Sequence, residues 1–260
     1  MQTILFHDTI FGPIHSRRLG ISLGINLSPR DGKICSFDCL YCEAGYNAQG
    51  PGTTGLPPRE EVARLLESRL RELAAEGVRP DVLTFSGNGE PTLHPEFAGI
   101  VDDTLRLRDR YCPGAKVSVL ANSTQLHRPD VVEALRRTDN AILKLDSAVE
   151  ETMRALDRPA SPAFTVALVV EQLAAFGPSA IVQTMLTRGT HDGITVDNTT
   201  PAELDALIEA YRLIRPREIM LYTIDRRTPE QSLEHIPRAE MAAAAERITA
   251  ATGIPVQVSA

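Results

Sequence analysis

The chain has 260 residues, 43% of them hydrophobic and 23% charged, with a formal net charge of -7 and an isoelectric point near 5.4. This acidic balance disfavours a protein that wraps nucleic acid nonspecifically, because that mode of binding depends on neutralising phosphates. No apolar run reaches 18 residues and the first residues lack the basic and apolar regions of a secretory signal, so we expect a cytoplasmic protein without a membrane segment.

Short segments rich in β-branched residues alternate along the chain with segments of helical periodicity. This alternation predicts an α/β fold with a parallel sheet and helices outside it. We expect one domain over residues 1–260, in which residues 1–20 and 252–260 are extensions and residues 256–258 add an edge strand. The strands are expected at 21–27, 82–86, 116–121, 141–145, 180–186 and 218–223, and the helices at 58–76, 95–110, 129–137, 162–176, 201–214 and 238–251.

Three cysteines, Cys35, Cys39 and Cys42, follow the first predicted strand on one short loop. Three thiolates can hold three irons of a cubic [4Fe-4S] cluster and leave the fourth iron open, since such clusters normally have four cysteine ligands. The alternative is a structural zinc site completed by Cys112, which would make the chain a non-catalytic metal-binding module. Zinc sites usually combine two closely spaced cysteine pairs or cysteine with histidine, so we favour the cluster.

A second motif, Gly87-Asn88-Gly89-Glu90, follows the second predicted strand. Its glycines allow the backbone to approach a ligand closely, and the Glu90 carboxylate can accept hydrogen bonds from an ammonium group. On its own the motif could equally be a tight turn between a strand and a helix.

These motifs, together with Asn122 and Asp146, all follow the carboxyl ends of different predicted strands. Barrels build their sites from several strand ends on one face, whereas an open doubly wound sheet concentrates its site at one switch point. The distribution therefore favours a partial (β/α)6 barrel.

The C-x3-C-x2-C spacing, with Tyr41 just before the last cysteine, resembles the signature of the radical S-adenosylmethionine (SAM) superfamily. The resemblance implies the same partial TIM-like barrel, a [4Fe-4S] cluster on the three cysteines, and SAM bound to the open iron. It implies that the motif at residues 87–90 corresponds to the Gly-Gly-Glu element that holds the SAM amino group, and that Tyr41 contacts the adenine.

Polar residues at the remaining strand ends are further candidates for cofactor contacts. In the resemblance, the fourth strand supplies a polar residue to the SAM ribose, a role for Lys144 or Asp146, although the two could instead pair with each other across an exposed strand tip. Buried polar groups without partners are costly, so we expect four more side chains to face the barrel lumen: Asn122, Ser123, Gln183 and Tyr222.

Three segments, at residues 11–26, 196–201 and 221–226, resemble a small single-domain radical SAM group near the wyosine-type tRNA-modifying Fe-S oxidoreductases. Compared with full wyosine synthases, we see no flavodoxin-like donor domain, which implies an external electron donor of the flavodoxin or ferredoxin type. Arg17, Arg18, Asp225 and Arg226 are the candidates for the catalytic, substrate-facing side, with Arg188 and Arg227 nearby in the predicted loops. Solvated loop charges are the alternative interpretation of the arginines.

The resemblance implies an enzyme that cleaves SAM reductively to a 5'-deoxyadenosyl radical. The acidic charge favours a small anionic metabolite or a peptide as the substrate over a tRNA base, which is the first alternative. A non-catalytic metal-binding module is the alternative of another class.

Overall fold

The computed structural model describes residues 4–16 and 18–259. Its main sheet has eight strands, and a separate pair forms a hairpin. The strands are β1 (Ile10–Ser16), β2 (Gly20–Ile25), β3 (Val82–Phe85), β4 (Lys116–Ala121), β5 (Asn140–Lys144), β6 (Ala180–Met185), β9 (Glu218–Tyr222) and β10 (Val256–Ser259), with the hairpin made by β7 (Arg188–His191) and β8 (Ile194–Asp197). The helices are α1 (Arg59–Ala75), α2 (Phe97–Tyr111), α3 (Pro129–Arg137), α4 (Glu150–Asp157), α5 (Val166–Phe176), α6 (Pro201–Ile214) and α7 (Arg238–Thr252).

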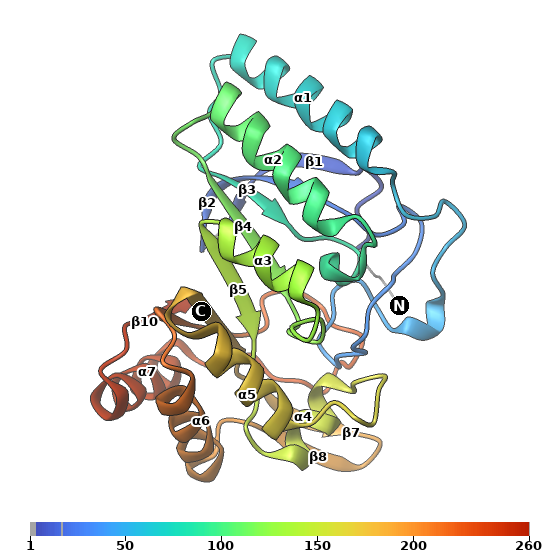
Figure 1. Ribbon diagram of the computed structural model, residues 1–260. Helices are drawn as coiled ribbons and strands as arrows, with labels where there is room; N and C mark the ends of the chain where they lie inside the picture. Colours follow the sequence, from blue (N-terminus) through green and yellow to red (C-terminus); the bar gives the residue numbers. More distant parts are fainter. Residues whose placement is uncertain (1–3, 17, 260) are drawn as a thin grey trace.

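The main sheet has the order β1-β2-β3-β4-β5-β6-β9-β10 and curls, with helices along its outer face (Figure 1). The strands from β2 to β10 pair in parallel, and β1 pairs antiparallel with β2 at one edge. The predicted partial (β/α)6 barrel is confirmed, including the additional edge strand at residues 256–258.

Side chains alternate across the sheet, as the period of two in a strand requires. On β6, Ala180 and Val182 belong to the main core between the sheet and the helices, whereas Ile181 faces inward. Ile181 packs with Ile142 and Met220 from the neighbouring strands, and Leu19 from the β1–β2 turn packs against this small inner cluster. The inner cluster therefore closes the amino-terminal end of the half-barrel, which we call its floor.

Several parts of the structure differ from the elements expected, among them the edge strand β1, which lies in the expected N-terminal extension. The helix expected at 162–176 begins only at Val166, because Thr165 caps it by accepting a hydrogen bond from the Leu168 backbone N–H at 3.2 Å. The short helix α4 and the β7–β8 hairpin were not expected. No helix among residues 4–16 and 18–259 is long and apolar enough to span a membrane.

Candidate active site

The cysteine loop, residues 35–42, is fixed from two sides by backbone hydrogen bonds. On one side, the Ile34 N–H donates to the Asn88 carbonyl at 3.2 Å, and the Glu90 N–H donates to the Ile34 carbonyl at 3.0 Å. On the other side, the loop pairs with the segment that ends α4, where the Leu40 N–H donates to the Leu156 carbonyl at 3.0 Å. The loop thus has a defined conformation between two secondary-structure elements.

The three loop cysteines are free thiols, and two of them have polar neighbours. The Asn122 side-chain amide lies 3.5 Å from the Cys35 Sγ, and the Lys144 Nζ lies 3.2 Å from the Cys39 Sγ. Burial raises the pKa of Cys35 to about 11 and raises the pKa of Cys39 well above its usual value. Thiol ligands bind metals as thiolates, so this environment needs the positive charge of bound iron to hold them deprotonated.

The three loop cysteines and Cys112 lie in different parts of the structure. Among the described residues, no three His, Cys, Asp or Glu side chains are grouped closely enough to hold one metal ion. A [4Fe-4S] cluster makes a different demand, because each of its irons takes a single protein thiolate. Cys112 precedes β4, whereas Asn122 follows it, so Cys112 is separated from the cysteine loop by about 20 Å of strand.

The glycines of the turn at residues 87–90 are required by packing. Gly87 and Gly89 have φ angles of 141° and 154°, and a Cβ on Gly89 would lie 1.9 Å from the Ile34 carbonyl oxygen. Asn88 is buried, and its side chain donates to the Phe6 and Pro29 carbonyls at 2.8 and 2.9 Å. Its Oδ1 accepts from the Phe6 N–H at 2.8 Å, so the protein backbone already occupies the Asn88 amide.

The buried carboxylate of Glu90 joins the ends of β3 and β4. Its Oε1 accepts from the Thr92 backbone N–H at 3.0 Å and from the Thr92 hydroxyl, and its Oε2 accepts from the Asn122 N–H at 2.6 Å. Burial raises the pKa of Glu90. A carboxylate offers about four acceptor sites, so Glu90 keeps capacity for one further donor such as an ammonium group.

A buried charged cluster lies beside Cys39 and consists of Tyr41, Lys144, Asp146 and Asp157. The Lys144 Nζ is 2.9 Å from the Asp146 Oδ2 and 2.8 Å from the Asp157 Oδ1, with the three side chains 13%, 0% and 2% exposed. The Tyr41 hydroxyl donates to Asp146 and accepts from Lys144. The Lys144–Asp146 pair therefore exists, but it is buried inside the half-barrel instead of lying at an exposed strand tip.

The protonation of this cluster follows from its burial and its charges. Burial opposes the charged form of Lys144, but the carboxylates of Asp146 and Asp157 raise its pKa well above the usual value. Burial raises the pKa of Asp157 to about 8. Asp157 was missed by the sequence analysis, because it ends an unexpected helix and belongs to no recognisable motif.

The other predicted lumen residues lie at the carboxyl ends of their strands. The Asn122 amide donates to the Ser36 hydroxyl at 2.9 Å, and the Ser123 hydroxyl donates to the Lys144 carbonyl at 2.9 Å. Gln183 pairs with Lys144 in the β5–β6 register, and Tyr222 pairs with Met185 in the β6–β9 register. The structure thus places these side chains around the cysteine loop, with their cofactor contacts still a prediction.

Arg18 extends from the floor of the half-barrel towards the site. Its backbone precedes β2 in the β1–β2 turn and so lies at the floor, but its guanidinium stacks on the ring of Tyr222 at the carboxyl end of β9, with the carbon 4.7 Å from the ring centroid. Its contact with a substrate stays a prediction. A residue before a parallel strand lies at the amino-terminal end of the sheet, opposite the cysteine loop. Arg17, predicted with it, lies outside the described residues.

Three more predicted residues, Asp225, Arg226 and Arg227, lie on the loop that follows β9, residues 223–237. Arg226 pairs with Glu43, the residue just after the cysteine loop, with its Nη1 2.8 Å from the Glu43 Oε2. Arg226 and Arg227 line a cavity of about 380 Å³, and Asp225 precedes them on the same loop. Arg188 lies elsewhere, on the hairpin, and pairs with Glu234 and Glu240 at 3.0 and 2.8 Å.

The unexpected hairpin packs over the cysteine loop. Val196 on β8 forms a small buried cluster with Leu40 and Leu156, and Leu233 packs against it. Asn198, just after β8, is fully buried and donates to the Asp146 and Met185 carbonyls at 2.8 and 2.6 Å. An asparagine in a loop often donates hydrogen bonds to backbone carbonyls and so fixes the loop, but the sequence alone does not show which carbonyls Asn198 contacts.

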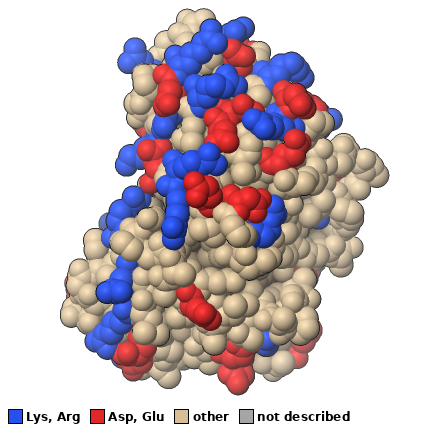
Figure 2. Space-filling model, in the orientation of Figure 1, with Lys and Arg blue, Asp and Glu red and all other residues tan. Residues whose placement is uncertain are grey.

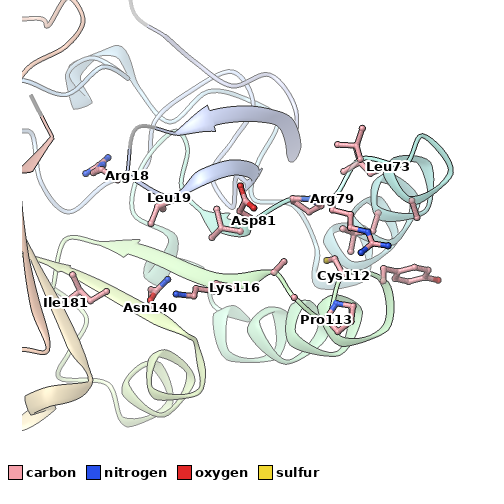
Figure 3. Close-up of a pocket in the computed structure, with 18 of the residues that line it drawn as sticks. Arg18, Leu19, Leu73, Arg79, Asp81, Cys112, Pro113, Lys116, Asn140 and Ile181 are labelled. Carbon is pink, nitrogen blue, oxygen red and sulfur yellow. The ribbon is translucent and has the colours of Figure 1, made fainter. Parts of the chain in front are cut away.

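A cavity of about 970 Å³ lies at the floor (Figure 3). Leu19, Cys112 and Lys116 line it, and each of them precedes or begins a parallel strand. The cavity is therefore at the opposite end of the sheet from the cysteine loop and is not part of the candidate site.

A family model described as the radical SAM superfamily matches residues 31–186, more than half of the chain. The UPF0026 protein MJ1312 of Methanocaldococcus jannaschii is 37% identical over 151 residues, which cover 57% of this chain and 44% of that protein. A protein named GTPase Obg from Brachyspira hyodysenteriae is 27% identical over 252 residues, 96% of this chain and 35% of that protein. The chain thus spans less than half the length of these two relatives. The P-loop pattern Gly-x4-Gly-Lys-Ser/Thr, which cradles nucleotide phosphates, does not occur in this sequence.

Solved structures of low identity share the fold. A radical SAM methyltransferase from Sphaerobacter thermophilus superposes with a TM-score of 0.65 at 15% identity, covering 92% of this chain and 65% of that one. TYW1 with a lysine–pyruvate adduct bound superposes with a TM-score of 0.61 at 14% identity, covering 88% of this chain and 73% of that one. With the family match and the half-barrel, this chain belongs to the radical SAM superfamily, whose enzymes use a [4Fe-4S] cluster and SAM.

Proposed function

We propose that the chain acts on a small anionic metabolite or a peptide, with Cys35, Cys39 and Cys42 holding the cluster. The observation that carries the proposal is the convergence of the pinned cysteine loop, the Glu90 carboxylate and the buried Lys144 cluster at one end of the half-barrel. When bound, the cluster and SAM supply a radical that begins the reaction on the substrate.

The cofactor side of the site consists of groups that are already positioned. Glu90 would accept the SAM ammonium, since its carboxylate is held by Thr92 and Asn122 and has acceptor capacity left. Asn122 is tied to Ser36 and lies against the Cys35 sulfur, so it would fix the edge of the cofactor pocket. Tyr41, Gln183 and Tyr222 would line the lumen beside these groups.

The substrate side would be formed by the loop after β9. Arg226 is bound to Glu43, next to Cys42, and together with Arg227 it lines the 380 Å³ cavity. Guanidinium groups bind carboxylates and phosphates with two parallel hydrogen bonds. A small anionic substrate would therefore compete with Glu43 for Arg226 and be held close to the cysteine loop.

The lysines weigh against the tRNA alternative. TYW1 has been solved with a lysine–pyruvate adduct, a chemistry that needs an uncharged lysine amine. The chain has three lysines, all in the described residues. Asp146 and Asp157 hold Lys144 as a charged ammonium, Lys33 donates to the Gly45 carbonyl, and Lys116 begins β4 at the floor, away from the cysteine loop. On the face in Figure 2, positive and negative side chains intermix over α1 and α2, with no broad basic surface there for RNA.

The ligand assignment is tested by reconstituting the whole chain anaerobically with iron and sulfide. We expect about four iron and four sulfide per chain, with the cluster lost from the Cys35→Ala, Cys39→Ala and Cys42→Ala variants. Cys112→Ala is the matched control, because Cys112 is also buried but lies at the floor. Loss of the cluster from Cys112→Ala, or one zinc per chain without iron, would contradict the proposal. A flavodoxin- or ferredoxin-type protein would supply the electron.

A further inference from the structure

Lysine is rare in this chain, and its placement is informative. The sequence has 24 arginines but only three lysines, Lys33, Lys116 and Lys144. Two of the three have side chains that are almost completely buried beside the cysteine loop. Arginine and lysine are not interchangeable, because lysine presents a compact point charge where a guanidinium presents a planar fork. A chain that uses arginine for nearly all its positive charges therefore has compact ammonium groups at this loop.

The Lys144 ammonium is held in one place by its neighbours. It lies 3.2 Å from the Cys39 Sγ and within 2.9 Å of both the Asp146 and the Asp157 carboxylates. It also lies 4.4 Å from the centroid of the Tyr41 ring. An ammonium group has three N–H donors, and four acceptors already surround it: the two carboxylates, the Tyr41 hydroxyl and the Cys39 sulfur. No donor is left for a ligand such as a ribose hydroxyl.

We propose that Lys144 is a positioning residue that sets the reduction potential of the cluster through the Cys39 sulfur, and that Asp146 and Asp157 hold its ammonium there. This inference rests on the proposed function, in which Cys39 is a cluster ligand. Hydrogen bonds to the sulfurs and nearby charge both shift the potentials of iron–sulfur clusters.

The sign of the effect follows from charge. Reduction adds one electron, delivered by the external flavodoxin- or ferredoxin-type donor, and hence one negative charge on the cluster side of Cys39. A positive charge in contact with the sulfur stabilises the reduced state and raises the potential. The two carboxylates oppose this effect by offsetting the charge of Lys144. Removing the ammonium should therefore lower the potential, and removing a carboxylate should raise it.

Lys33 provides a matched comparison, because it lies just before the cysteine loop. Its Nζ donates to the Gly45 carbonyl at 2.7 Å and lies 3.7 Å from the Asp38 Oδ1. Like Lys144, it is a buried ammonium with a carboxylate neighbour, but its hydrogen bond goes to a carbonyl and not to a sulfur. Losing Lys33 should therefore disturb the loop while changing the potential less.

The test is an EPR-monitored redox titration of the reconstituted proteins without SAM, at pH 9, where Asp157, with its pKa raised to about 8, carries its negative charge and Lys144 remains an ammonium. In Lys144→Met we expect reduction to become at least tenfold less favourable, a shift of about 59 mV to lower potential for a one-electron couple. Asp157→Asn should shift the potential upward, and Lys33→Met should shift it less than Lys144→Met. Iron and sulfide contents, measured on the same samples, report any structural loss of the cluster separately from its potential.

The outcomes separate the two ideas. An unchanged potential in Lys144→Met, or shifts of the same sign in Lys144→Met and Asp157→Asn, would overturn the role of Lys144 while leaving the ligand assignment standing. If Lys144→Met cannot hold a cluster, the sign of the Asp157→Asn shift decides alone. A cluster that survives Cys39→Ala would refute the ligand assignment itself, and the inference with it.

Discussion

The two ends of the half-barrel use the same strands but carry different chemistry. At the floor, β5, β6 and β9 present Ile142, Ile181 and Met220 on the inner face. Two residues further along the same strands, the inward positions are Lys144, Gln183 and Tyr222. Both sets line one face because side chains alternate with a period of two, so about 7 Å of strand separates an apolar floor from a polar site.

This difference shows that positions two residues apart on one face of a strand have separate roles, one in stability and one in the site. The floor positions contact one another and Leu19, and they stabilise the curled sheet. The positions above them carry charged and polar side chains, and one of these, Lys144, contacts the cysteine loop at the Cys39 sulfur. The larger cavity is at the floor, whereas the buried ionic cluster is at the other end, so cavity size does not locate the chemistry.

The largest effect on stability is expected at the floor. Ile181→Ala should lower the free energy of unfolding by about 2–5 kcal/mol, because it removes a fully buried side chain from a closed apolar cluster. Gln183→Leu, two residues further along β6, keeps a similar volume and should change stability by less than about 1 kcal/mol. Denaturant unfolding of both variants measures the difference. Equal losses would show that the floor and the site are not separable.

The parallel core could be predicted from sequence, because every strand is a short β-branched run and every connecting helix repeats its apolar residues with helical spacing. The β7–β8 hairpin could not. Its strands have four residues each, Ile194 is exposed, and the hairpin is fixed by residues distant in sequence, such as Glu234, whose N–H donates to the Arg188 carbonyl at 2.7 Å. Nonlocal contacts of this kind leave no periodic pattern.

The site was predictable to the extent that its residues belong to motifs. The cysteine spacing and the turn at residues 87–90 locate the loop, and the structure brings both together. Arg18 was predicted to face the substrate. Its backbone lies in the β1–β2 turn at the floor, but its guanidinium reaches Tyr222 at the carboxyl end of β9, so its role stays a prediction. The contact between Asp157 and Lys144 depends on the pairing of the cysteine loop with the end of α4, which no local pattern encodes.

An effect of intermediate size, on SAM binding, is expected at the turn formed by residues 87–90. Glu90→Ala should weaken SAM binding at least tenfold, about 1.4 kcal/mol, because it removes the carboxylate proposed to accept the SAM ammonium. Iron content should stay the same, since Glu90 is not a thiol ligand. SAM binding to the reconstituted protein can be followed by the change in the EPR spectrum of the reduced cluster.

The neighbouring variant Asn88→Ala provides the comparison for Glu90. Its amide is already bound to the Phe6 and Pro29 backbone, so losing it should lower the free energy of unfolding by about 1–3 kcal/mol and change SAM affinity less than Glu90→Ala does. A larger loss of SAM affinity in Asn88→Ala would instead mean that the shape of the turn, and not the carboxylate, governs binding.

The smallest effect on stability is expected at the rim, where Arg226 pairs with Glu43. The two side chains are 52% and 42% exposed, so breaking the pair should cost less than about 1 kcal/mol of unfolding free energy. Binding should respond more strongly, and with opposite signs. Arg226→Ala should weaken the binding of inorganic phosphate, used as a small anionic probe, whereas Glu43→Gln should strengthen it by freeing the guanidinium. Calorimetric titration of the reconstituted proteins measures both changes. Equal phosphate affinity in all three proteins would remove Arg226 from the substrate side. A separate titration with bulk tRNA tests the substrate class: tight binding with a steep salt dependence would mean several phosphate contacts and favour the tRNA alternative.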